Sequence, residues 1–116
     1  MLKYFLSILL IFSLFQCTKK EFGNLKNIEK FTPIEFLKRY PNNYLNKMVK
    51  VKGKVVEESS RGLWINVQEK YFTISINFES ENFSLPSIIS NNIVAIGRFI
   101  QSDDGYMIAG RYIKIE

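Results

Sequence analysis

Cys17 is the only cysteine of this 116-residue chain, and the chain contains no histidine. Ser–His and Cys–His catalytic pairs, as well as zinc sites built from Cys and His, need more of these side chains than the sequence supplies. An intramolecular disulfide is excluded in the same way. The thiol of Cys17 is therefore better explained as an attachment point than as part of a reactive site.

Two acidic pairs, Glu57–Glu58 and Asp103–Asp104, are the other side chains that could serve acid–base catalysis or bind a metal. Neighbouring residues of a strand point to opposite faces of the sheet, so neither pair is expected to converge on one site. Asp103 and Asp104, before Gly105, are typical of a turn. We therefore expect no catalytic residue, no cofactor and no metal, and hence a protein that is not an enzyme.

The residues before Cys17 predict an export signal. Lys3 gives a positive start, and an apolar run from residue 4 to residue 15 follows, broken only by two serines. A run of about 12 residues has the length of a signal-peptide core and is shorter than the roughly 20 residues that span a membrane. The bulky Phe15 and Gln16 differ from the small residues that precede an ordinary cleavage site.

The segment LFQC, residues 14–17, resembles a bacterial lipobox, whose cysteine receives a diacylglycerol thioether and becomes the new N-terminus. Leu14 fits that pattern, whereas Gln16 stands where Gly, Ala or Ser is usual. The resemblance implies a signal peptide over residues 1–16 and a lipoprotein that carries acyl chains such as palmitate on Cys17. Such chains anchor a protein at about 0.8 kcal/mol per buried CH₂. The alternative is an uncleaved anchor with an incidental cysteine.

The chain after Cys17 divides into two parts. Residues 17–31 have mixed charge and no sustained apolar period, which predicts a tether. Residues 32–116 contain 11 basic and 9 acidic side chains, so most of the net charge of +5 lies before them. A nearly balanced domain argues against a phosphate-binding surface, because such surfaces depend on clustered Lys and Arg.

The domain is expected to open with a short helix. Thr32 is a candidate N-cap, Pro33 suits the first helical position, and Glu35 completes a capping box. Pro41 ends the helix at or before Tyr40. A helix of only about two turns persists by packing against another element.

The rest of the domain alternates apolar and polar residues with period 2, the pattern of half-buried strands. Gly53 stands where a bulge or a sharp bend of the first strand would sit, and Gly110 would permit a bend in the last strand. Five strands with such bends favour a small closed barrel over a flat sheet, so the predicted fold class is all-β: a β-barrel preceded by a short N-terminal helix. The five expected strands lie at residues 49–55, 63–67, 72–78, 93–100 and 106–115.

The segments "NKMVKVKGKVVEESSRGLWINV", "FTISINF", "NNIVAIGRF" and "GYMIAGRYIKI" look like a small OB-fold domain covering residues 32–116. They are similar to uncharacterised bacterial tRNA-anticodon-domain-like families, which also place a short helix before a V-x-G-K-V strand. They also resemble exported domains with Gly-Cys-Trp at the start of strand two, where this chain has Gly62-Leu63-Trp64 and lacks the cysteine. The resemblance implies a five-stranded binding scaffold without naming a ligand.

Trp64 is the most informative side chain of the domain. With Ile65 facing the interior, Trp64 and Asn66 point outward from the second strand, and Thr73 and Ser75 flank them on the third. An exposed aromatic stacks a base or a sugar at about 1–3 kcal/mol. The alternative, and the commoner one, is that the preceding helix covers Trp64 through Phe36, Leu37 and Tyr40 as part of ordinary packing.

Three lysines, Lys50, Lys52 and Lys54, share the outer side of the first strand. They could follow an anionic polymer, but lysines on a strand also discourage edge pairing and aid solubility. Glu57 and Glu58 follow them and weaken the local positive field.

These observations favour a non-enzymatic lipoprotein of the bacterial cell envelope, on its periplasmic or surface face. Its OB-like module would bind another envelope protein or a glycan through strands one to three. The alternative is a single-stranded nucleic-acid-binding OB domain, which export and the near-neutral domain charge make the weaker hypothesis.

Mass spectrometry of the mature protein tests the anchor. We expect the N-terminal peptide to begin at Cys17 and to carry two or three acyl chains. A mature protein that still begins at Met1, or whose Cys17 is unacylated, would contradict the lipoprotein hypothesis.

Overall fold

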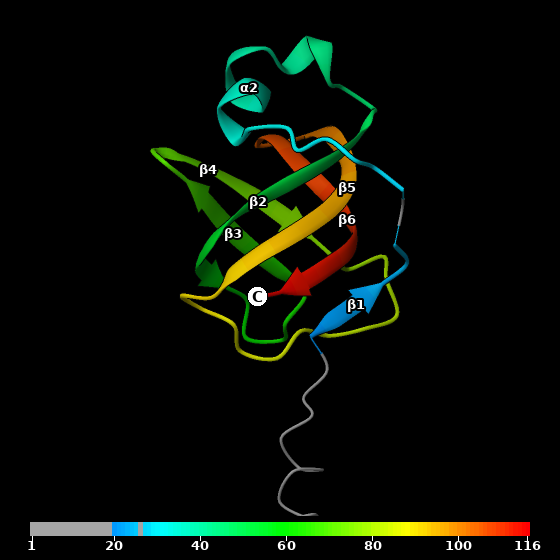
Figure 1. Ribbon diagram of the computed structural model, residues 1–116, viewed down its shortest axis with the longest axis vertical. Helices are drawn as coiled ribbons and strands as arrows, with labels where there is room; N and C mark the ends of the chain where they lie inside the picture. Colours follow the sequence, from blue (N-terminus) through cyan, green and yellow to red (C-terminus); the bar gives the residue numbers. More distant parts are fainter. Residues whose placement is uncertain (1–19, 26) are drawn as a thin grey trace, which may run out of the picture.

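The computed structural model describes residues 20–25 and 27–116 and consists mostly of strands, with one short helix (Figure 1). The signal peptide predicted over residues 1–16 and the lipidation predicted at Cys17 lie outside this description. The elements run in the order β1 (Glu21–Gly23), α2 (Ile34–Arg39), a 3₁₀ turn η1 (Pro41–Asn43), β2 (Met48–Glu58), β3 (Trp64–Glu69), β4 (Phe72–Asn77), β5 (Asn92–Ser102) and β6 (Gly105–Ile115).

Strands β2 to β6 form a closed barrel. The strand order is β6-β4-β3-β2-β5, and β5 pairs back onto β6 to complete the ring. Every pairing is antiparallel except that of β4 with β6, which is parallel and joins Ile76 to Ile108 and Asn77 to Ala109. The predicted five-stranded OB-like barrel preceded by a short helix is confirmed.

The barrel interior is filled by the apolar side chains that alternate along each strand. The helix α2 closes one end, where Ile34 and Leu37 are buried in the core cluster. The segment between β4 and β5 closes the other end with Phe78, Leu85 and Ile88. The core therefore runs the whole length of the barrel.

The start of α2 differs from the predicted capping box. No side chain of the helix N-terminus caps it, and Pro33 takes the N-cap position. The backbone N–H of Ile34 instead donates to Glu69 Oε1 at 3.0 Å, from the end of β3. Glu35 pairs with Arg39 at 2.9 Å, one turn later in the helix. The cap is thus a tertiary contact, which a local motif cannot reveal.

A sixth strand, β1, lies within residues 17–31, where the sequence predicts a tether. It pairs antiparallel with the second half of β6, with Phe22 opposite Ile113. The ladder is extended by Ile115 N donating to Lys20 O at 2.7 Å and by Asn24 N donating to Arg111 O at 3.1 Å. Part of the predicted tether is therefore bound to the barrel.

Side chains also hold β1 in place. The ring of Phe22 lies 5.5 Å from that of Phe83, which lies 5.4 Å from that of Phe78. On the opposite side of the short strand, Tyr112 Oη donates to Glu21 Oε1 at 2.7 Å. Burial, and then the hydrogen bond and negative charge of Glu21, raise the pKa of Tyr112 to about 12.

Two glycines allow close approach between strands. A Cβ at position 53 would lie 2.6 Å from the carbonyl oxygen of Gln68, where β2 crosses from β5 to β3. At Gly53, where a bulge or a sharp bend is expected, β2 changes partner, whereas the bulge of β2 lies further along, between Val55 and Glu57. A Cβ at position 110 would lie 2.3 Å from Cε1 of Phe78, so the Phe78 ring packs where β6 has no side chain.

The contact at Gly110 predicts a specific loss of stability. We expect Gly110→Ala to lower the free energy of unfolding by about 1–3 kcal/mol, because overpacking of a filled core costs this much. Combined with Phe78→Leu, which removes the clashing ring, the alanine should cost less than it does alone. Denaturant unfolding of the parent, both single variants and the double variant measures this, and strictly additive losses would contradict the contact.

Tyr112 provides a pH-dependent test of the β1 contact. Its pKa rises from the ordinary value of 10.0 to about 12, so the folded state holds the phenol proton more tightly than the unfolded state does. Its contribution to the free energy of unfolding is therefore complete below pH 10 and is lost as the pH rises towards 12. Tyr112→Phe should remove this part of the alkaline loss, measured by urea unfolding at each pH. If the parent and Tyr112→Phe lost stability in parallel over this window, the predicted coupling would be absent.

Candidate functional site

The outer face of β3 and β4 brings together the four side chains that the sequence singles out on these strands. Asn66 lies opposite Ser75 in the ladder, and Trp64 and Thr73 lie on the same side of the sheet. The interior is filled by Ile65, Val67, Ile74 and Ile76. The residues that alternate with them along β3 and β4 therefore point outward. We call this surface the β3–β4 face; its members are Trp64, Asn66, Gln68, Thr73, Ser75 and Asn77.

A row of hydrogen bonds crosses the middle of the β3–β4 face. Ser75 Oγ donates to Asn66 Oδ1 at 2.8 Å, and Asn66 Nδ2 donates to Glu57 Oε1 at 3.3 Å. The row continues onto β2 because the bulge between Val55 and Glu57 turns Glu57 towards Asn66. The amide and hydroxyl groups are thereby fixed in direction before any ligand arrives.

The start of β3 positions Trp64. Ser59 Oγ accepts hydrogen bonds from the backbone N–H groups of Leu63 at 2.8 Å and of Trp64 at 3.1 Å. Ser59 N in turn donates to Trp64 O at 3.0 Å. The loop of residues 59–62 therefore joins β2 to β3 as a hairpin and fixes the backbone of Trp64.

The helix does not pack over Trp64 as the alternative hypothesis expects. It contacts the hairpin end of β3 and β4, where Ile34 meets Glu69. Trp64 is five residues from Glu69, or about 17 Å along the strand. The side chains of Phe36 and Tyr40 are 44% and 54% exposed and pack edge to face on each other. Trp64 is half-buried at the opposite end of the barrel wall.

The three lysines of β2 spread over two adjoining regions of the surface. Lys50 and Lys52 lie beside β5, with their Nζ atoms 4.4 Å and 5.1 Å from the centre of the Phe31 ring. Only Lys54 reaches the β3–β4 face, where it lies opposite Gln68. Lys54 differs from Lys50 and Lys52 because β2 bends at Gly53, where the strand leaves β5 and joins β3.

A shallow groove of about 470 Å³ joins these two regions. Its lining includes Lys52 and Lys54 from β2, Gln68 and Glu69 from β3, and the side chain of Phe31. Glu69 is already engaged with Ile34 N. The groove extends the β3–β4 face around the barrel and adds both signs of charge to it.

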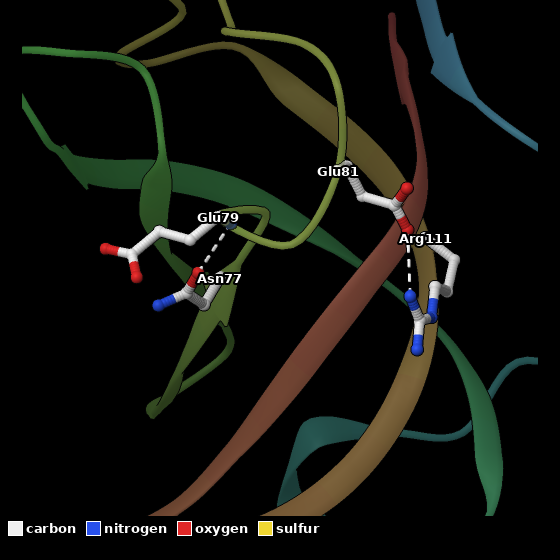
Figure 2. A network of polar contacts seen from close by, with 4 residues as sticks. All are labelled: Asn77, Glu79, Glu81 and Arg111. Atoms are coloured by element: carbon white, nitrogen blue, oxygen red, sulfur yellow. Dashed lines mark hydrogen bonds and ion pairs between the residues drawn. The ribbon is translucent and has the colours of Figure 1, made fainter.

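The lower border of the β3–β4 face is built by the segment after β4 (Figure 2). Asn77 Oδ1 accepts from Glu79 N at 2.7 Å and turns the chain away from the sheet. Glu81 then pairs with Arg111 on β6, with Oε1 3.2 Å from Nη1. A second pocket of about 420 Å³ beside this pair contains Arg98, whose Nη1 donates to Asn46 O at 2.7 Å. The two guanidinium groups are therefore engaged within the protein.

The described part of the chain contains no cluster of three or more side chains that could hold a metal ion. Within residues 20–25 and 27–116, no helix is long and apolar enough to cross a membrane. The β3–β4 face offers stacking on Trp64 and directional hydrogen bonding by amides and hydroxyls.

Sequence reasoning missed Gln68, Asn77 and Glu57 as members of the site. The same period-2 alternation that identifies Trp64 and Asn66 would have included Gln68, and that of β4 would have included Asn77. Glu57 depends on the bulge of β2, whereas the sequence predicts a bulge or a sharp bend at Gly53.

Comparisons with known proteins find no matching family model and no matching curated protein. Among solved structures, the chain is similar to the hypothetical protein ygiW from E. coli, at 14% sequence identity and a TM-score of 0.61. The match covers 82% of this chain and 100% of that chain. Such a likeness shows the fold alone, and together with the closed barrel it fits an OB-like fold.

Proposed function

We propose that this protein is a non-enzymatic, lipid-anchored binding module of the bacterial cell envelope, and that the β3–β4 face binds an uncharged glycan. One observation carries the binding proposal: a tryptophan lies on the same face as an amide–hydroxyl row whose members are held in fixed directions. A sugar ring offers an apolar face for stacking and hydroxyl groups for hydrogen bonds, which matches that combination. In OB-folds this face binds oligonucleotides and oligosaccharides.

The charges around the face favour a neutral glycan over a nucleic acid. Lys54 and Glu57 balance each other on the adjoining strand, and Lys50 and Lys52 lie around the barrel next to Phe31. Binding to a phosphate backbone needs several cations along one path, because affinity comes mainly from counterion release. The β3–β4 face has no such path among the described residues.

The proposal of a lipid anchor is supported by the sequence alone. The apolar leader and the lipobox-like LFQC segment support acylation of Cys17, and acyl chains would keep the module at a membrane. An envelope location brings the barrel close to cell-wall and surface glycans, so the two parts of the proposal agree with each other.

Removal of Trp64 tests the binding proposal. With a neutral N-acetylglucosamine oligosaccharide as the probe, we expect Trp64→Ala to weaken binding by about fivefold to 150-fold, as loss of about 1–3 kcal/mol of stacking implies. Isothermal titration calorimetry measures this, and circular dichroism shows whether the fold is kept. Trp64→Phe, which retains an aromatic ring, should keep part of the affinity.

Lys50 provides the matched control. The variant Lys50→Ala should bind the oligosaccharide as the parent does, because Lys50 lies beside Phe31 and does not line the groove that extends the β3–β4 face. A salt-sensitive affinity for single-stranded DNA that Lys50→Ala weakens would instead support a nucleic-acid-binding module and contradict the glycan proposal.

A further inference from the structure

The described chain begins at one end of the barrel. Lys20 O accepts from Ile115 N at the end of β6, and Lys20 shares a pocket with Pro86, Ile88 and Asn91. Figure 1 shows β1 and the segment between β4 and β5 at this lower end, with α2 at the opposite end. We call the surface formed by Lys20 and residues 86–91 the anchor end.

The chain between Cys17 and Lys20 is short. Three residues of extended chain reach at most about 11 Å. Because β1 fixes the position of Lys20, this length limits how far the barrel can move from an acylated Cys17. A tether of residues 17–31, as predicted from the sequence, would have left the barrel free to tumble, whereas three residues do not.

The turn at residues 86–91 is firmly held to the barrel. Glu58 accepts hydrogen bonds from Ser87 Oγ at 2.5 Å and from Ile88 N at 2.8 Å, which lower the pKa of its carboxyl group. Ser90 N donates to Val55 O at 2.8 Å, and Val55 N donates to Asn91 O at 2.9 Å. The turn is therefore fixed against β2 on both sides of Ile89.

This rigid turn holds an apolar side chain out to solvent. Ile89 is 50% exposed, while its neighbour Ile88 is 3% exposed and lies in the core. The hydrogen bonds on each side of Ile89 hold its backbone in this position. Its neighbours in the sequence, apart from the buried Ile88, are small or polar residues: Pro86, Ser87, Ser90 and Asn91.

We propose that, given the lipid anchor proposed at Cys17, the anchor end rests on the bilayer and inserts Ile89 at the boundary of headgroups and acyl chains. The opposite end, with α2 and the 93% exposed Tyr71 of the β3–β4 hairpin, then points away from the membrane. The β3–β4 face lies along the side of the barrel, with Trp64 nearest the lipid. In this orientation the glycan site is open laterally and is not pressed against the bilayer.

Charges of both signs lie at or beside the anchor end, among them Lys20, Glu58 and Glu116. The acyl chains and Ile89 are therefore expected to supply most of the attraction to the bilayer.

Tryptophan fluorescence in brominated lipid tests this orientation. The intact acylated protein would be reconstituted into vesicles of dibrominated phosphatidylcholine, with Trp64→Phe as the common background. A single tryptophan is then placed at the anchor end, by Ile89→Trp, or at the opposite end, by Tyr71→Trp. Both sites are exposed, and they lie on the order of 20 Å apart along the barrel axis, as tilted strands of 11 residues imply.

We expect strong loss of fluorescence for Ile89→Trp and little or none for Tyr71→Trp, because bromine quenches only at close range. Equal quenching of the two variants, or stronger quenching of Tyr71→Trp, would overturn the orientation while leaving the anchor intact. Flotation with the vesicles and the mass of the Cys17 peptide report separately on the anchor. Protein that does not float would reject the anchor, and with it the orientation that depends on the three-residue link.

Discussion

Closure of the barrel depends on the short parallel pairing of β4 with β6. Only two residue pairs make this contact, whereas β5 and β6 pair along their whole length. The closure is reinforced by Phe78, which directly follows β4 and packs onto β6 at Gly110, where a Cβ would collide with its ring. It is reinforced again by the ion pair of Glu81 with Arg111. The barrel thus closes at the short β4–β6 pairing, and side chains that follow β4 in the sequence stabilise this closure.

The short β4–β6 pairing also explains why the barrel needs a sixth strand, β1, along β6. Because β4 ends at Asn77 while β6 continues to Ile115, the second half of β6 would present an unpaired edge. Exposed edges of this kind invite pairing with other chains, and proteins usually cover them. Here β1 covers the edge, and Phe22 joins the ring contacts of Phe83 and Phe78. Covering the edge also fixes the point at which the chain leaves the barrel, which links closure to the proposed orientation on the membrane.

The long strand β2 decides which polar side chains share a surface. It pairs first with β5 and then with β3, and Gly53 lies at the crossing. This change of partner directs Lys50 and Lys52 to Phe31 and leaves Lys54 and Glu57 beside the β3–β4 face. A row of like charges in the sequence is therefore spread around the barrel, and the face that carries Trp64 is close to neutral because Lys54 and Glu57 both lie beside it. The character of the proposed ligand follows from this separation.

The sequence by itself determined the number of barrel strands, their alternation and the short helix before them, because these depend on local apolar periodicity and on Pro and Gly positions. It also placed Trp64, Asn66, Thr73 and Ser75 on one face, since that follows from the period of 2 in paired strands. Only the tertiary structure decided the helix cap on Glu69, the bulge that brings Glu57 to Asn66, the separation of the lysines and the docking of β1. Each of these joins residues far apart in the chain or depends on how strands bend at closure, and such long-range geometry leaves no local pattern in the sequence.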